Sequence, residues 1–287
     1  MTDSPAQKAK TRPAPFVAEV VRTEKISETM VRLVVGGPGL AGFQPSPHAD
    51  SYVKLMFLPA GTPRPLGPDG RLDLDAVRAA LPPDAQPRQR SYTVRAFADG
   101  ELTVDVVVHG DEGVAGPWAE CATIGDEVLV VGPGGAWSPD PTAASYLFAG
   151  DASALPAIAV ALERLAPDAV GHAVVEVHGP EDEIPLAAPA GVLVHWVHQG
   201  FGVPGLGLID SVAALPPLPQ PVSAFVHGEA GSVRELRRHL RNERGVARDQ
   251  LSVSGYWRLG ADDEGWRATK REWLATIEQS EAAAGLV

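Results

Sequence analysis

The chain has 287 residues, of which 45% are hydrophobic, and a formal net charge of −12. This length suffices for two domains, and the negative charge argues against general binding to nucleic acid or to anionic membranes. Cys121 is the only cysteine, which excludes a disulfide framework and a cysteine-ligated metal cluster. The first residues lack the apolar core of a signal peptide, and no apolar run approaches the length of a membrane span. We therefore expect a cytoplasmic monomer that binds neither nucleic acid nor membranes.

Residues 16–138 have the pattern of a β domain, preceded by a tail, residues 1–15, that we expect to be disordered. A long proline-rich insertion in this domain contains one short helical stretch, residues 74–81. Turn residues separate six runs that are rich in β-branched residues, and six such strands predict a closed antiparallel barrel. The predicted strands lie within residues 16–26, 30–37, 51–58, 89–97, 101–110 and 126–133.

From residue 144 to 287 the pattern changes to strands that alternate with helices and end in a helix over 264–284. This alternation predicts a Rossmann-like parallel sheet with helices on both faces. A β-barrel followed by such a domain resembles the ferredoxin-reductase superfamily. That resemblance implies a flavin in the barrel and a nicotinamide nucleotide at the second domain. The predicted strands lie within residues 145–151, 171–179, 192–199, 223–229 and 250–257, and the other helices within 153–168, 205–215 and 232–245.

Residues 88–95 read RQRSYTVR and combine the groups that a flavin requires. On a strand, Arg90 and Tyr92 share one face, while Thr93 and Arg95 share the other. Tyr92 supplies a planar ring for the isoalloxazine, and Thr93 supplies a polar contact at its N5/O4 edge. The two arginines supply cations for a pyrophosphate. The alternative is an edge strand with a solvated arginine face.

The next motif favours the flavin. Small residues from Gly113 to Pro117 predict a turn that opens a short helix at Trp118. Free N–H groups at a helix start beside glycine form an anion nest, which suits the second phosphate of a dinucleotide. Two phosphate-binding features indicate FAD rather than FMN. The flavin-binding residues expected in this stretch are Val107, His109, Gly113, Ala115, Trp118 and Ala119.

In combination these motifs resemble the siderophore-interacting protein family, or ferric-siderophore reductases, from Phe16 to about Trp266. The family's motifs stand here as RSYTVR, HGDEGVAGPWA, IGD, GPGG, GDASALPAI, GEAGSVRELRRHL and GYWRLG. Val114 and Ile124 stand where proline is usual, and His227 stands where alanine is usual. The resemblance implies an FAD-dependent enzyme that reduces iron(III) in a siderophore with electrons from NADH, NADPH or a ferredoxin.

The second domain contributes three further candidates. In GDASALPAI, Ser153 is expected to cap the helix, and Asp151 and Ser153 to face the nicotinamide. No G-x-G-x-x-G follows this strand, so a standard Rossmann grip is not supported. Arginines in the helix from Ser232, which has a capping-box spacing, either meet a 2′-phosphate or face solvent. Trp257, after the last strand, either shields the flavin or packs in the core.

A ferric siderophore is often anionic, so an acidic chain needs a local basic pocket to bind it. The candidates are Lys54 and, on one face of the last helix, Arg267 and Lys270, with solvated side chains as the alternative. Four histidines do not have the spacing of a compact ligand set, so we expect solvated strand ends and no resident metal. They are His172, His178, His195 and His198.

Besides the residues expected to bind the flavin and the substrate, four residues are candidates for catalysis: Tyr92, Thr93, Asp151 and Trp257.

Two other functions of the protein stay open: a general flavin reductase, which would turn over free flavin, and a non-enzymatic carrier of ferric siderophore or haem. The intact RSYTVR motif argues against the carrier.

Overall fold

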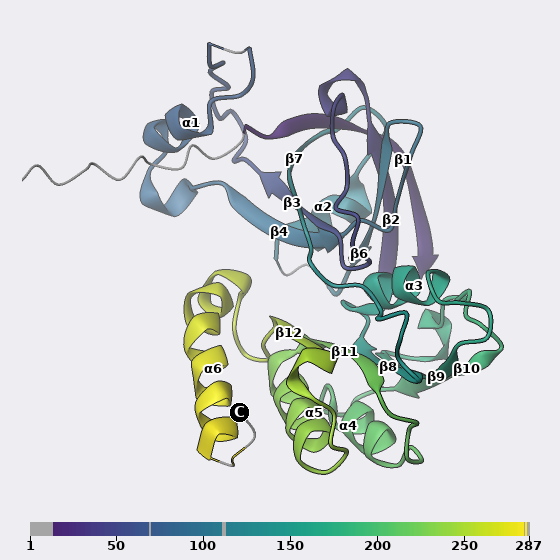
Figure 1. Ribbon diagram of the computed structural model, residues 1–287. Helices are drawn as coiled ribbons and strands as arrows, with labels where there is room; N and C mark the ends of the chain where they lie inside the picture. Colours follow the sequence, from purple (N-terminus) through teal and green to yellow (C-terminus); the bar gives the residue numbers. More distant parts are fainter. Residues whose placement is uncertain (1–13, 69, 111–112, 284, 286–287) are drawn as a thin grey trace, which may run out of the picture.

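The computed structural model describes residues 14–68, 70–110, 113–283 and 285. Most of the predicted disordered tail, residues 1–15, lies outside this part of the chain. The described residues form two sheets that lie one above the other (Figure 1), the first from residues 16–134 and the second from residues 145–257. The predicted fold class, an antiparallel barrel-like domain followed by a parallel α/β domain, is confirmed.

The first sheet contains seven antiparallel strands rather than six, in the order β4-β3-β7-β1-β2-β6-β5. The predicted strand 89–97 is interrupted because the chain changes partner there: Val94 N–H donates to Ser51 O, and Arg95 N–H donates to Thr103 O. Since β4 and β5 stand at opposite edges of this order, strand pairing does not close the barrel. The strands are β1 (Phe16–Ser27), β2 (Met30–Gly36), β3 (Tyr52–Phe57), β4 (Arg88–Thr93), β5 (Ala96–Ala98), β6 (Glu101–Val107) and β7 (Glu127–Gly134).

The proline-rich insertion folds onto the outside of this sheet. Its helix α1 (Leu74–Ala80) is close to the predicted stretch, and the Asp73 side chain caps it by accepting the N–H groups of Asp75 and Ala76. Leu74 and Val77, three residues apart on one helix face, are buried against the sheet. A second short helix, α2 (Ala115–Cys121), follows β6.

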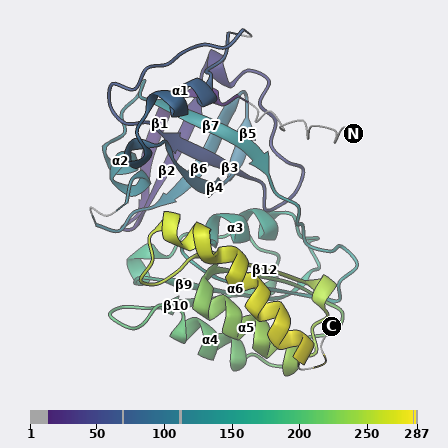
Figure 2. The same ribbon diagram turned by 90° about the vertical axis from the view of Figure 1, so that its left-hand side faces the viewer.

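The second sheet has five parallel strands in the order β10-β9-β8-β11-β12. Helix α3 (Leu155–Glu163) lies between this sheet and the first one, and α4 (Leu206–Ala213) and α5 (Ala230–Asn242) cover the opposite face (Figure 1). Helix α6 (Asp263–Ala283) runs beside β12, at the edge of the sheet (Figure 2). The strands are β8 (Ser145–Asp151), β9 (Val170–Val177), β10 (Gly191–His198), β11 (Val222–Glu229) and β12 (Leu251–Trp257).

The two halves are joined by apolar and polar contacts. Met30 from the first sheet is buried in the apolar cluster beneath α3. The buried Asp182, which follows β9, accepts hydrogen bonds from Ser27 Oγ (2.9 Å) and from the N–H and Oγ1 of Thr29 (both 2.8 Å). Because Ser27 and Thr29 lie in the β1–β2 turn, this carboxylate holds that turn against the α/β half. These contacts fix the orientation of the first sheet, including β4, relative to the parallel sheet.

Candidate active site

Strand β4 brings the RSYTVR motif to the side of the first sheet that faces α6 and β12 (Figure 1). It pairs with β3, which places Lys54 opposite Ser91 and Leu55 opposite Arg90. Tyr92 is half-buried and packs against the core of the first sheet, and burial raises its pKa well above the usual value of a tyrosine. The phenol is neutral at physiological pH, and the half-buried ring offers a planar group of the kind that packs against a cofactor ring.

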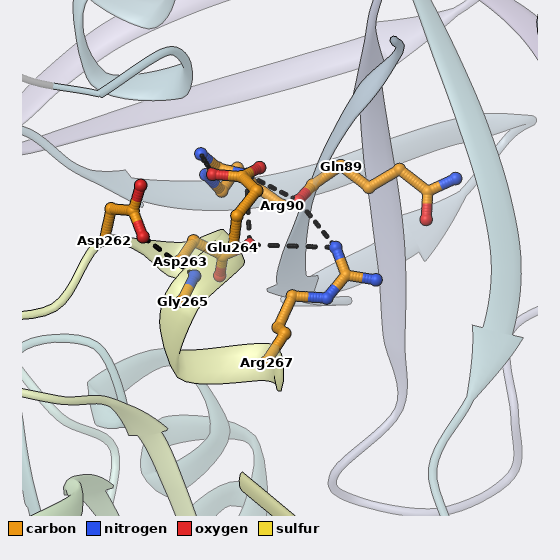
Figure 3. Close-up of polar contacts among 7 residues, drawn as sticks. All are labelled: Gln89, Arg90, Asp262, Asp263, Glu264, Gly265 and Arg267. Atoms are coloured by element: carbon orange, nitrogen blue, oxygen red, sulfur yellow. Dashed lines mark hydrogen bonds and ion pairs between the residues drawn. The ribbon is translucent and has the colours of Figure 1, made fainter. Parts of the chain in front are cut away.

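Arg90 is bound by the first turn of α6 (Figure 3). Its Nη1 lies 3.0 Å from Asp263 Oδ2 and 2.8 Å from Glu264 Oε1, and its Nη2 lies 3.1 Å from Glu264 Oε2. Hydrogen bonding to Arg90 lowers the pKa of Glu264, so this ion pair persists at neutral pH and is lost as the pH falls through that lowered pKa. One guanidinium thus faces two carboxylates, and a flavin phosphate at Arg90 has to share it with them.

Arg95 is bound by a different element from Arg90. Its guanidinium forms a two-pronged ion pair with Glu163, at the end of α3, with distances of 3.0 and 2.5 Å. Since the strand ends at Thr93, the predicted alternation of faces does not extend to Arg95. Thr93 itself is buried, and its backbone pairs with Tyr52 of β3. In this arrangement the two arginines of the motif do not converge on one position.

Helix α2 begins at Ala115, three residues before the predicted start at Trp118. No capping side chain accepts its first N–H groups. Just before the helix, Gly113 takes a positive φ of 86°, which glycine adopts readily. Backbone N–H groups of this kind can bind a phosphate, and the predicted contact with the flavin stays a prediction. The other predicted flavin residues here differ in exposure: Val107 packs towards the α/β half, His109 is exposed, Trp118 contacts Phe57 edge to face, and Ala119 is buried.

Asp151 lies at the end of β8 and joins three strand ends. Its Oδ1 accepts the N–H (2.9 Å) and Oγ (2.5 Å) of Ser153, and its Oδ2 accepts Glu229 N–H and Trp257 Nε1–H, both at 2.8 Å. The expected helix cap is therefore wrong: Ser153 binds Asp151, and α3 starts at Leu155 after Ala154. Since both carboxylate oxygens are engaged by the chain, the geometry favours Asp151 as a residue that orients the Trp257 indole.

The helix-cap prediction for α5 is also corrected. The helix begins at Ala230 rather than Ser232, and the capping side chain is Glu229, which accepts the N–H of Ser232 at 2.8 Å. The local spacing of Ser232 and Glu235 resembled a capping box, but Glu229 ends β11 and reaches the helix first. The exposed arginines of α5 pair within the helix surface, Arg234 with Glu235 and Arg238 with Glu235 and Glu243.

A buried histidine, which the motif comparison marked only as a departure from the family pattern, is part of a polar network. His227 Nδ1 lies 2.9 Å from Tyr256 Oη, its Nε2 lies 2.9 Å from Ser252 Oγ, and Phe225 stacks on its ring. Burial lowers the pKa of His227 to about 3, so the imidazole is neutral. The network orients Tyr256, next to Trp257, and the histidine in place of alanine was the one sequence signal for it.

The three basic residues predicted for the substrate lie around β4 and β12. Arg267 Nη1 donates to Gln89 O at 3.4 Å and lies 3.7 Å from Asp263, so it belongs to the Arg90 cluster (Figure 3). Lys270 Nζ donates to Ser254 Oγ of β12 at 3.1 Å, and burial lowers its pKa. Helix α6 therefore positions both side chains beside β4 and β12. Lys54 pairs with Ser91, so strand alternation places its side chain on the sheet face opposite that of Arg90 and Tyr92.

The four histidines do not gather into one site. His172 Nδ1 and His195 Nε2 lie 2.9 Å apart, and His198 hydrogen-bonds to Glu183 at 2.8 Å. His172 and His195, which were expected at solvated strand ends, therefore contact each other instead. Across the described ranges, no group of three or more His, Cys, Asp or Glu side chains is placed to hold a metal ion. Within the same ranges, no helix has the length and apolar character needed to cross a membrane.

The bond between Asp151 and Trp257 leads to a prediction. Asp151→Asn should lower the free energy of unfolding by about 1–3 kcal/mol, because one amide group has to face N–H donors that the carboxylate accepted. It should also shift the Trp257 contribution to fluorescence, obtained by subtracting the emission of the matching Trp257→Phe variants. Asp168→Asn, at an exposed position of the same domain, is the control. An unchanged Trp257 emission would show that Asp151 does not orient the indole.

Comparison with known proteins agrees with this geometry. Residues 19–137 match the family model of the siderophore-interacting FAD-binding domain, and residues 143–260 match that of the siderophore-interacting protein. An uncharacterized protein of Mycobacterium tuberculosis is 46% identical over 278 residues, which cover 91% of this chain and 95% of that protein. Ferric vibriobactin reductase ViuB of Vibrio cholerae is 33% identical over 261 residues, which cover 88% and 92%.

A solved structure supports the same assignment. The siderophore-interacting protein SipS from Aeromonas hydrophila superimposes with a TM-score of 0.76 at 30% identity, covering 91% of this chain and 98% of that one. The two family models together span both sheets, and the first of them describes a domain that binds FAD. The chain belongs to the siderophore-interacting protein family, and its first sheet is the FAD-binding domain of that family.

Proposed function

We propose that this protein is an FAD-dependent reductase that releases iron from ferric siderophores with electrons from a nicotinamide nucleotide. The observation that carries the proposal is the placement of the RSYTVR strand, with the half-buried Tyr92 ring and Arg90, beside the first turn of α6, the helix that follows β12. The names of the relatives support it, since they include ferric vibriobactin reductase and, in Escherichia coli, an NADPH-dependent ferric-chelate reductase that is 29% identical.

The proposed reaction assigns electron transfer to the FAD and binding of the FAD to the protein's residues. Bound FAD accepts a hydride and donates electrons singly, which suits a two-electron donor and a one-electron acceptor. Tyr92 would pack against the flavin ring, Arg90 and the backbone around Gly113 would bind its phosphates, and Trp257 would be the residue that shields it. One nicotinamide nucleotide then supplies the electrons for two iron(III) ions and leaves as the oxidised form with one proton.

The substrate is proposed to bind where α6 meets β4. Arg267 and Lys270 supply positive charge there, and an anionic chelate requires it because the chain as a whole is acidic. Lys54, on the neighbouring strand β3, is the third proposed substrate residue. Iron weakly held after reduction leaves the siderophore, so the protein needs no iron ligand of its own.

The test uses the flavin spectrum. The purified protein should contain FAD, its visible absorbance should bleach on anaerobic reduction, and a ferric siderophore should restore the absorbance while a ferrous-iron indicator reports two iron(II) ions per flavin. A matched apo-siderophore should leave the reduced spectrum unchanged. Re-oxidation by free FMN at an equal rate would instead indicate a general flavin reductase, and a protein that binds the siderophore without any flavin would indicate a carrier.

A further inference from the structure

The carboxyl ends of the parallel strands lack basic side chains over a long part of the chain. From residue 165 to 233 there is no lysine or arginine, although Arg164 and Arg234 lie directly on either side. This stretch comprises β9, β10, α4 and β11. In open α/β sheets a nucleotide binds outside the carboxyl ends of the strands. A dinucleotide bound there meets no cation from these four elements.

One corner of this edge presents an apolar surface beside a carboxylate. The loop after β10 lies against the end of β9, because Gln199 N–H donates to Val177 O and Gly200 N–H donates to His178 O, both at 2.9 Å. The next residue, Phe201, is fully exposed. Val203 and Leu206, which follow it in the chain, are also exposed, so the ring does not stand alone. An exposed aromatic ring of this kind can stack on a base.

Glu183 lies at the same corner. It follows β9, is exposed, and hydrogen-bonds to His198 Nε2, at the end of β10, over 2.8 Å. Two neighbouring carboxylates are already engaged by the fold: Asp182 binds the β1–β2 turn, and Glu176 accepts the N–H groups of Gly205 and Leu208 at the start of α4. Glu183 is thus a carboxylate of this corner with a surface available to a ligand.

We propose that the ends of β9 and β10 bind the adenosine part of the donor nucleotide, and that this corner selects NADH over NADPH. Phe201 packs against the adenine, and Glu183 accepts a hydrogen bond from the ribose 2′-hydroxyl. A carboxylate after the second strand of such a sheet recognises a free 2′-hydroxyl, whereas an arginine accommodates a 2′-phosphate. That phosphate adds a charge of about −1.5 to −2 and here meets a carboxylate in place of an arginine. The inference rests on the proposed function, since it names the electron donor.

Calorimetric titration of the oxidised, FAD-containing protein with NAD⁺ and with NADP⁺ tests the binding directly. NAD⁺ should bind about tenfold more tightly or better, and the difference should shrink as salt screens the charges. Phe201→Ala should weaken NAD⁺ binding by about tenfold through the loss of base stacking. Ile124→Ala, which truncates an exposed apolar side chain in the first half of the chain, should change nothing.

A charge reversal makes the specificity test sharper. Glu183→Arg should weaken NAD⁺ binding and strengthen NADP⁺ binding, so that the order of the two affinities reverses. Asp168→Arg changes the net charge by the same amount at an exposed position before β9, at the amino end of that strand. It should leave the order of the two affinities unchanged. Equal affinities of the wild-type protein for the two nucleotides, or an unchanged NAD⁺ affinity in Phe201→Ala, would overturn the proposal.

The failure of this inference can be told from the failure of the proposed function. Protein reduced with dithionite needs no nucleotide, so its re-oxidation by a ferric siderophore tests the reductase function alone. If this re-oxidation occurs while NAD⁺ does not bind, the adenosine site is wrong and the reductase function stands. If the reduced protein is not oxidised by the ferric siderophore, the reductase function fails whatever the nucleotide affinities are.

Discussion

Arg237→Ala is expected to destabilise the protein by about 3–5 kcal/mol, because it leaves the buried Glu281 carboxylate without its main partner. The two side chains are 8% and 9% exposed, and the guanidinium meets both carboxylate oxygens, at 2.6 and 2.7 Å. Burial opposes ionisation of Glu281, but its hydrogen bonds and charge interaction with Arg237 prevail and lower its pKa. Denaturant unfolding at neutral pH measures the loss.

Two variants make this prediction selective. Arg248→Ala breaks a second ion pair to α6, between Arg248 in the turn before β12 and Glu278, but these side chains are 57% and 55% exposed, so the loss should be about 0–1 kcal/mol. Replacing both buried partners, as Arg237→Met with Glu281→Leu, should recover most of the stability, since neither charge is then left alone. A loss for Arg237→Ala no larger than that for Arg248→Ala would contradict the account.

The contribution of this pair also depends on pH. A carboxylate whose pKa is lowered by folding stabilises the native state above its unfolded-state pKa, and the stabilisation is lost as the pH falls through the folded-state value. The free energy of unfolding of the wild-type protein should therefore decrease more steeply as the pH falls through that range. The Glu281→Gln variant should lack this part of the pH dependence, which unfolding curves at several acidic pH values can show.

Arg90→Ala should weaken FAD binding by about ten- to a hundredfold, because a phosphate loses a charge-assisted hydrogen-bond partner. The opposite change is expected for Asp263→Asn combined with Glu264→Gln. These carboxylates form ion pairs with Arg90 and repel an anion there, so neutralising them should tighten FAD binding several-fold. Titration of flavin-stripped protein with FAD gives the three dissociation constants.

Arg88→Ala is the matched control, since Arg88 lies two residues earlier on β4, on the same face, and is exposed. It should leave the FAD affinity near the wild-type value. If instead Arg90→Ala keeps wild-type affinity and the Asp263/Glu264 variant loses stability, the role of Arg90 is to hold α6 against the barrel. In that case the phosphates have to bind through the backbone around Gly113.

Much of the architecture could be predicted from the sequence because it depends on local patterns. Alternating or β-branched runs between turn residues marked the strands of the first sheet, and runs of strand that alternate with helical segments marked those of the second. The short helical stretch in the insertion marked α1, which begins at Leu74 as expected. The change from short β runs to alternating strands and helices indicated the order of the two halves. Short motifs such as RSYTVR were recognisable because their spacing lies within one strand, so no long-range contact was needed to identify them.

The partners of the charged side chains were decided by the tertiary structure. Periodicity places Arg90 on a face of β4, but its partners Asp263 and Glu264 lie more than 170 residues away and reach it only because α6 crosses beside that strand. Arg95 meets Glu163 because the end of α3 lies beside the residues that follow β4. Ser153 looked like a helix cap, but its hydroxyl donates to Asp151 instead. The Asp151 carboxylate is held in place by donors from the ends of β11 and β12, Glu229 N–H and Trp257 Nε1–H. A hydrogen bond depends on positions to within a fraction of an ångström, which packing between distant segments determines and local sequence does not.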